Sequence, residues 1–97
     1  MARKYFRITD VIEICRVDAA FIDYLERERI IQPVIRRNLK FYSPDQVDRV
    51  RVAHLLIEEM GVNLEGAEVA LHMREQMIAM QRQFNELLRL LGRQLKR

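Results

Sequence analysis

The chain has 97 residues, 17 Lys and Arg against 14 Asp and Glu, and 49% hydrophobic residues. This length permits one ordinary domain, and the hydrophobic fraction argues against intrinsic disorder. A single cysteine excludes a disulfide framework and, without a His cluster, a structural zinc site. Three glycines and two prolines favour a mostly helical chain. No apolar leader or bilayer-spanning run is present, so we expect a soluble, cytoplasmic protein that does not bind membranes.

Two short helices are predicted in the first third of the chain. Residues 5–8 indicate a short strand that leads into a helix capped by Thr9 or Asp10. A tight connection separates this helix from a second one, which Asp18 caps and which ends near residue 28. The i, i+3, i+4 spacing predicts that the second helix buries Phe21, Ile22, Tyr24 and Leu25.

A two-stranded ribbon and a third helix are predicted next. Residues 34–42 indicate two strands joined by a basic tip, where Asn38 best tolerates a left-handed turn. Ser43 can cap the following helix, and Gln46 can close a capping box back onto it. This helix runs toward Met60, and we expect Gly61 to end it as a left-handed cap.

The last helix, which starts at Asn63, carries the clearest pattern in the chain. Its apolar residues alternate three and four apart, and they are Ala70, Met73, Met77, Met80, Phe84, Leu87 and Leu91. Such an a/d repeat over about three heptads indicates a coiled coil, so we expect these residues to form a homodimer interface. The alternative is a helix folded back on its own domain. These seven residues are called the seam. Leu88, Leu90 and Leu95 widen the seam near its end, which suggests further packing on a globular body.

The order of these elements resembles that of the MerR-type winged-helix regulators, over about residues 5–91. Five motifs carry the resemblance, and they lie at residues 5–11, 23–33, 38–42, 42–50 and 61–66. The family's second-helix signature ends in Gly-Leu-Leu-x-Pro, where this chain has Arg29-Ile30-Ile31-Gln32-Pro33. The last motif, Gly-Val-Asn-Leu-Glu-Gly, resembles the link in the family's heat-shock repressors. The resemblance implies a winged helix-turn-helix with a small β wing over residues 1–62 and a dimerisation helix over residues 63–97.

The first function implied by the resemblance is a DNA-binding transcriptional regulator. Two winged-helix heads of a homodimer would then lie on successive half-sites of double-stranded DNA. The basic wing supplies the main phosphate contacts under this hypothesis. Its predicted DNA-binding residues are Arg36, Arg37 and Lys40, which can reach phosphates, Tyr42, which packs or hydrogen-bonds, and Arg27 at the end of the second helix.

The second helix departs from the family pattern, and this departure leads to an alternative. Where MerR proteins use an Arg to hold the DNA backbone, this chain has Asp23, with Ala19 and Ala20 on the same side. An acidic group repels phosphate, and alanines offer only apolar contact to a base edge. An acidic second helix resembles the CbpM chaperone modulators, which bind the J-domain of a DnaJ-type co-chaperone. Complementary charge would then place that basic partner on Asp18, Asp23, Glu26 and Glu28.

A third hypothesis is a dimerisation module without a nucleic-acid role. We expect no enzyme, because no Ser or Cys nucleophile accompanies a His and no Gly-rich phosphate loop is present. We also expect no metal or cofactor. Cys15 is predicted to be a buried apolar residue. His54 and His72 are each predicted to pair on a helix face with an acid four residues away, Glu58 and Glu68 respectively.

Overall fold

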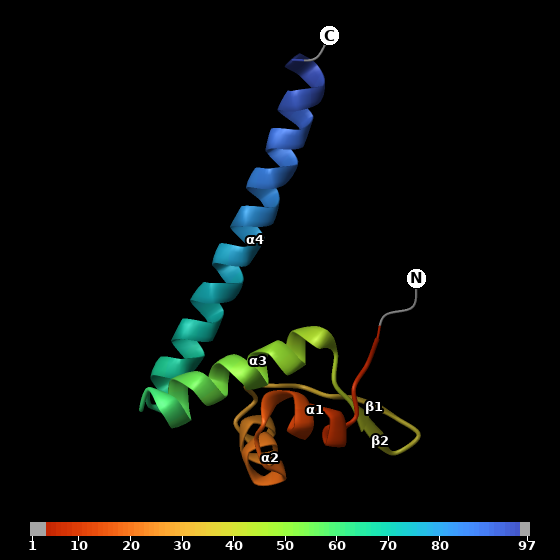
Figure 1. The fold of residues 1–97 in the computed structure, drawn as a ribbon, viewed down its shortest axis with the longest axis vertical. Helices are drawn as coiled ribbons and strands as arrows, with labels where there is room; N and C mark the ends of the chain where they lie inside the picture. Colours follow the sequence, from red (N-terminus) through yellow and green to blue (C-terminus); the bar gives the residue numbers. More distant parts are fainter. Residues whose placement is uncertain (1–3, 96–97) are drawn as a thin grey trace.

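The computed structural model describes residues 4–95. A small helical part, residues 6–62, is called the head, and one long helix projects from it (Figure 1). The fold is mostly α with a two-stranded wing, as the sequence predicts. Predictions that concern residues 1–3, residues 96–97 and the Leu95 side chain lie outside this description. The elements in chain order are α1 (Ile8–Cys15), α2 (Ala19–Arg27), β1 (Val34–Arg36), β2 (Leu39–Phe41), α3 (Pro44–His54), η1 (Leu55–Glu59) and α4 (Leu64–Leu95).

The first helix begins earlier than predicted. Arg7 is its N-cap, and the Asp10 carboxylate accepts a hydrogen bond from the Arg7 backbone N–H at 3.0 Å. Asp10 therefore acts from inside the first turn and is not the cap. The strand predicted at residues 5–8 reduces to one bridge, in which Phe6 and Tyr42 exchange two backbone hydrogen bonds of 2.8 and 2.7 Å.

The second helix and the wing form where the capping residue and the turn residues of the sequence predict them. The Asp18 carboxylate accepts a hydrogen bond from the backbone N–H of Phe21 at 2.9 Å, which confirms Asp18 as the cap of α2. In the wing, β1 pairs antiparallel with β2. Arg37 and Asn38 both take left-handed conformations between the strands, with φ of 53° and 65°. A two-residue turn of this kind matches the natural twist of a hairpin.

The third helix has one predicted and one unexpected feature at its start. Ser43 caps α3 by accepting from the Gln46 backbone N–H at 3.4 Å, as predicted. The Gln46 side chain does not close the capping box on Ser43. Its amide oxygen accepts from the backbone N–H of Gln32 at 2.7 Å and so ties the loop after α2 to α3.

A π-helical turn, η1, continues α3 and changes which side chains meet. Met60 donates its backbone N–H to the Leu55 carbonyl at 3.0 Å, a hydrogen bond across five residues. The wider turn brings Glu59, not the predicted Glu58, nearest to His54, with 4.0 Å between Nδ1 and the carboxylate. Gly61 follows with φ of +71°, the left-handed conformation expected for it.

The hydrophobic core lies inside the head and receives residues from α1, α2, α3 and the base of the wing. Its largest fully buried side chain is Tyr42. Cys15 is buried, as predicted, and its thiol donates to the Val47 carbonyl at 3.5 Å. Burial raises the pKa of this thiol above its ordinary value. The long helix contributes Ala67 and Leu71, which are 0% and 1% exposed.

Two different sides of α4 face the head and the solvent. Ala67 and Leu71 pack on the head, whereas Met73 to Leu91 of the predicted seam are 47–68% exposed. At 100° per residue, the centres of these two sides are roughly 130° apart around the helix axis. The seam is therefore not covered by its own head. No helix within residues 4–95 is long and apolar enough to cross a membrane.

Three arginines stand in backbone conformations that usually favour glycine. Arg16, Arg29 and Arg37 have φ of 56°, 60° and 53°. Arg29 turns the chain out of α2, and hydrogen bonds from Arg29 to the Glu26 carbonyl and from Ile30 to the Leu25 carbonyl fix it there. A side chain in this region costs about 1–2 kcal/mol relative to a right-handed conformation. The glycine of the resembled motif would avoid that cost.

We expect Arg29→Gly to raise the free energy of unfolding by up to about 1 kcal/mol, because relief of the left-handed strain exceeds the added chain entropy. Urea denaturation at one fixed protein concentration measures the change. Arg36→Gly is the control: this arginine lies in an extended strand, so the substitution should lower stability by about 0.5–1 kcal/mol. Equal losses in both variants would contradict the assignment of strain to Arg29.

Candidate nucleic-acid interface

The wing has two faces with different chemistry. Its register pairs Val34 with Phe41 and Arg36 with Leu39 on one face, and Ile35 with Lys40 on the other. Arg36 and the turn residue Arg37 are exposed at the tip. The structure thus brings these two predicted DNA contacts together, next to each other and open to solvent.

Lys40, the third predicted wing contact, is paired with an acid of the head. Its Nζ donates to the Glu26 carboxylate at 2.6 Å. This hydrogen bond raises the pKa of Lys40, so the ammonium charge is held against the carboxylate. Lys40 therefore joins the wing to α2, and much of its charge is already balanced before any phosphate approaches.

Tyr42 supports the wing from inside the core. It is fully buried, and its hydroxyl donates to the second oxygen of Glu26 at 3.2 Å. Burial, and then the negative charge of Glu26, raise the pKa of Tyr42 to about 12. Tyr42 is among the predicted DNA-binding residues as the one that packs or hydrogen-bonds; it does both here, but its ring has no exposed surface for DNA. Its role in the structure is to fix the base of the wing.

The acidic residues of α2 do not form one open surface. Asp18 uses a carboxylate oxygen to cap the helix, and Glu26 is half-buried between Lys40 and Tyr42. Asp23 and Glu28 are exposed. Asp23 is accompanied by the exposed residues Ala19 and Ala20, as the sequence indicates, and Arg27 lies exposed in the last turn.

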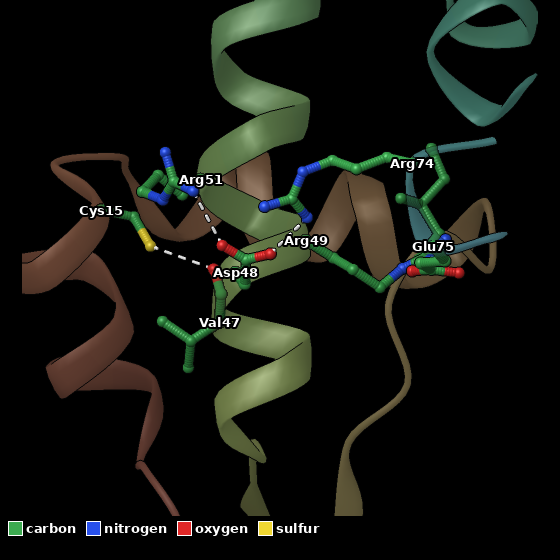
Figure 2. Close-up of polar contacts among 8 residues, drawn as sticks. Cys15, Val47, Asp48, Arg49, Arg51, Arg74 and Glu75 are labelled. Atoms are coloured by element: carbon green, nitrogen blue, oxygen red, sulfur yellow. Dashed lines mark hydrogen bonds and ion pairs between the residues drawn. The ribbon is translucent and has the colours of Figure 1, made fainter. Parts of the chain in front are cut away.

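A charged clamp, defined as Asp48 and Arg49 of α3 with Arg74 and Glu75 of α4, connects the head to the long helix (Figure 2). Asp48 accepts from Arg74 at 2.6 Å, and Arg49 pairs with Glu75. Arg49 also donates from Nε to the Ile30 carbonyl at 2.6 Å. Two adjacent opposite charges on one helix thus meet two on the other, which favours one orientation of α4.

Sequence reasoning missed this clamp. Its two dipeptides, Asp48-Arg49 and Arg74-Glu75, are visible in the sequence but resemble ordinary exposed helix charges. Only the packing of Ala67 and Leu71 on the head decides that they face each other. An opposite order of charge in the two dipeptides is the one signal that could have suggested the pairing.

Two opposing effects of the surroundings act on the pKa of the Asp48 carboxylate. Burial raises its pKa, but hydrogen bonds from Arg51 and Arg74 outweigh that effect and hold the pKa of Asp48 below its ordinary value. A carboxyl group with a lowered pKa in the folded state stabilises that state above the pKa of the unfolded chain. The stabilisation is lost as the pH falls through the folded-state pKa.

We expect Asp48→Asn to lower the free energy of unfolding at pH 7 by at most about 1 kcal/mol, because both partners are partly exposed to screening solvent. The difference between this variant and the parent chain should shrink below about pH 4 as Asp48 itself becomes protonated. Denaturation curves at pH 7, 5, 4 and 3 measure it. Glu13→Gln, an exposed acid on α1, is the control, and a constant gap down to pH 3 would contradict the clamp.

Comparison with known proteins gives one family. The sequence model described as MerR HTH family regulatory protein matches residues 6–89. The match therefore includes the whole head, the wing and most of α4. No curated protein matches the chain.

Proposed function

This chain belongs to the MerR HTH family of regulatory proteins, and we propose that it is a DNA-binding transcriptional regulator that acts as a homodimer. The exposed seam of α4 is the observation that carries this proposal. Six large apolar side chains line one side of a helix whose other side already packs on the head, and they are Met73, Met77, Met80, Phe84, Leu87 and Leu91. Apolar surface of this extent is stabilised when a second copy removes it from water.

The charges along α4 favour antiparallel pairing of the two copies. Residues 64–79 carry three glutamates and one arginine, a net charge of −2. Residues 80–95 carry three arginines and one glutamate, a net charge of +2. Antiparallel helices would place the acidic half of each copy beside the basic half of the other, whereas parallel helices would place like charges together.

In the DNA complex, the wing tip would make the principal backbone contacts. Arg36 and Arg37 are exposed, whereas Lys40 is already paired with Glu26. The exposed side of α2 carries Asp23, two alanines and, in its last turn, Arg27, so one basic residue is present there against one acid. We therefore expect DNA binding in which phosphate contacts contribute more than sequence readout.

A pair of spin labels would test both the dimer and its orientation. In a Cys15→Ala background, a label at Gln94→Cys should lie roughly 40 Å from its counterpart in an antiparallel pair centred on the seam. Pulsed electron paramagnetic resonance measures this distance. A label at Gln81→Cys, near the seam centre, is the control and should be close to its counterpart. A short distance at both positions would indicate parallel helices, and no dipolar coupling at either would contradict the homodimer.

A salt series with random-sequence duplex DNA would test the regulator proposal. We expect affinity to fall steeply with salt, because each phosphate contact releases about 0.9 of a counterion. Arg36→Gln with Arg37→Gln removes four positive charges per dimer and should reduce the slope by up to about 3–4. Arg89→Gln with Arg93→Gln removes the same charge from distal α4; at a concentration where light scattering shows this variant to be dimeric, it should leave the slope nearly unchanged. Equal effects of the two pairs would contradict a wing interface.

A second candidate is a chaperone modulator that binds the J-domain of a DnaJ-type co-chaperone. The exposed acid Asp23, at the position where the resembled family has an arginine, favours this candidate. Asp23→Arg should strengthen DNA binding if the chain is a DNA regulator. Loss of J-domain capture in that variant, with no DNA binding by the parent chain at low salt, would support the modulator instead. If the chain shows neither DNA binding nor J-domain capture, the remaining hypothesis is a dimerisation module.

A further inference from the structure

A cavity of about 450 Å³ lies in the corner between the head and α4. Three segments line it, namely residues 29–32 after α2, residues 45–49 of α3 and residues 74–82 of α4. It lies on the side of α4 that faces the head, away from the exposed seam. The cavity is therefore separate from the wing and from the surface assigned to the second copy.

The charges around this cavity favour an anion. Arg49 and Arg74 are neutralised by the clamp, together with the acids Glu75 and Asp48. Among residues 4–95, neither of the other two lining arginines makes a salt bridge to an acid, nor does the lining residue Asp45. The unpaired lining charges thus sum to two arginines, Arg29 and Arg82, against one aspartate.

The backbone at Arg29 gives a second, independent observation. Its φ of 60° is costly for an arginine, yet an arginine occupies this position in the lining of the cavity. Strained residues in proteins cluster at ligand sites, where the side chain has a role that the backbone conformation opposes. Here that role would be to supply a planar donor group for a carboxylate or phosphate.

Apolar groups complete the walls of the cavity. Ile30 and Ile31 line it from the head and are almost fully buried. Ile78 and Ala79 line it from α4. These apolar residues thus stand within a lining that is otherwise polar or charged. The arrangement suits a ligand with one anionic end and an apolar body.

We propose that this cavity binds a small organic anion, with Arg29 and Arg82 as its counter-charges. The ligand would contact the head and α4 at once, beside the clamp. Its binding would therefore stabilise one angle between the head and the long helix. A ligand that fits this angle better than the others would shift the population of angles toward it. The site does not depend on DNA binding, and it can be tested without DNA.

Amide chemical shifts of the ¹⁵N-labelled full chain would test the site, with benzoate as the probe and benzylamine as a probe of equal size and opposite charge. We expect benzoate to shift the amides of residues 29–32 and 74–82 in a saturable way, with a dissociation constant on the order of 1 mM. Arg29→Gln with Arg82→Gln should weaken that binding at least about tenfold, since two charge-assisted hydrogen bonds are lost. An unchanged spectrum elsewhere would show that this variant folds.

Arg36→Gln with Arg37→Gln removes equal charge at the wing tip and should keep benzoate binding. The proposal would be overturned by the absence of a saturable shift at these amides, by equal shifts with benzylamine, or by full binding by the Arg29 and Arg82 variant. Loss of binding in the wing variant as well would also overturn it, because net charge alone would then explain the effect. These readouts do not change if the DNA proposal fails.

Discussion

The direction in which α4 leaves the head depends on a small contact. Ala67 and Leu71 pack on the core, and one turn further the clamp joins Asp48 and Arg49 to Arg74 and Glu75. Beyond this point the helix extends away from the head (Figure 1). A rigid helix amplifies any change of angle at its base, so the spacing of two paired heads would follow from these few contacts. The clamp is partly exposed, and its strength therefore depends on ionic strength.

Glu26 makes a second charged contact, which connects two elements within the head. One carboxylate accepts from Lys40 and from the buried hydroxyl of Tyr42, and it thereby joins α2 to the wing. The same contact pairs the charge of an exposed lysine with an acid, so that less of this charge is available to a phosphate. The wing thus gains a fixed position relative to α2 and loses part of its attraction for phosphate. This exchange explains why its electrostatics depend on the two tip arginines.

Local signals in the sequence predicted much of the fold. Asp18, Ser43 and Gly61 end or begin helices as expected, since capping depends on neighbours along the chain. The heptad pattern predicted the long helix, although its role as a dimer interface stays a prediction. What the sequence did not predict was non-local: the full burial of Tyr42 and the clamp arise from packing between distant segments. The π turn was missed because it differs from an α-helix by one residue per turn, without a distinct sequence signal.

The composition of the seam has a consequence for the choice of partner. Its seven positions hold an alanine, three methionines, a phenylalanine and two leucines, without one polar residue. A buried asparagine or lysine in a coiled coil penalises mismatched registers, and methionine adapts its shape to many surfaces. Discrimination between this chain's own copies and related helices would therefore fall to the flanking charges. In a cell with several such regulators, mixed pairs would be limited by electrostatic matching more than by the shape of the core.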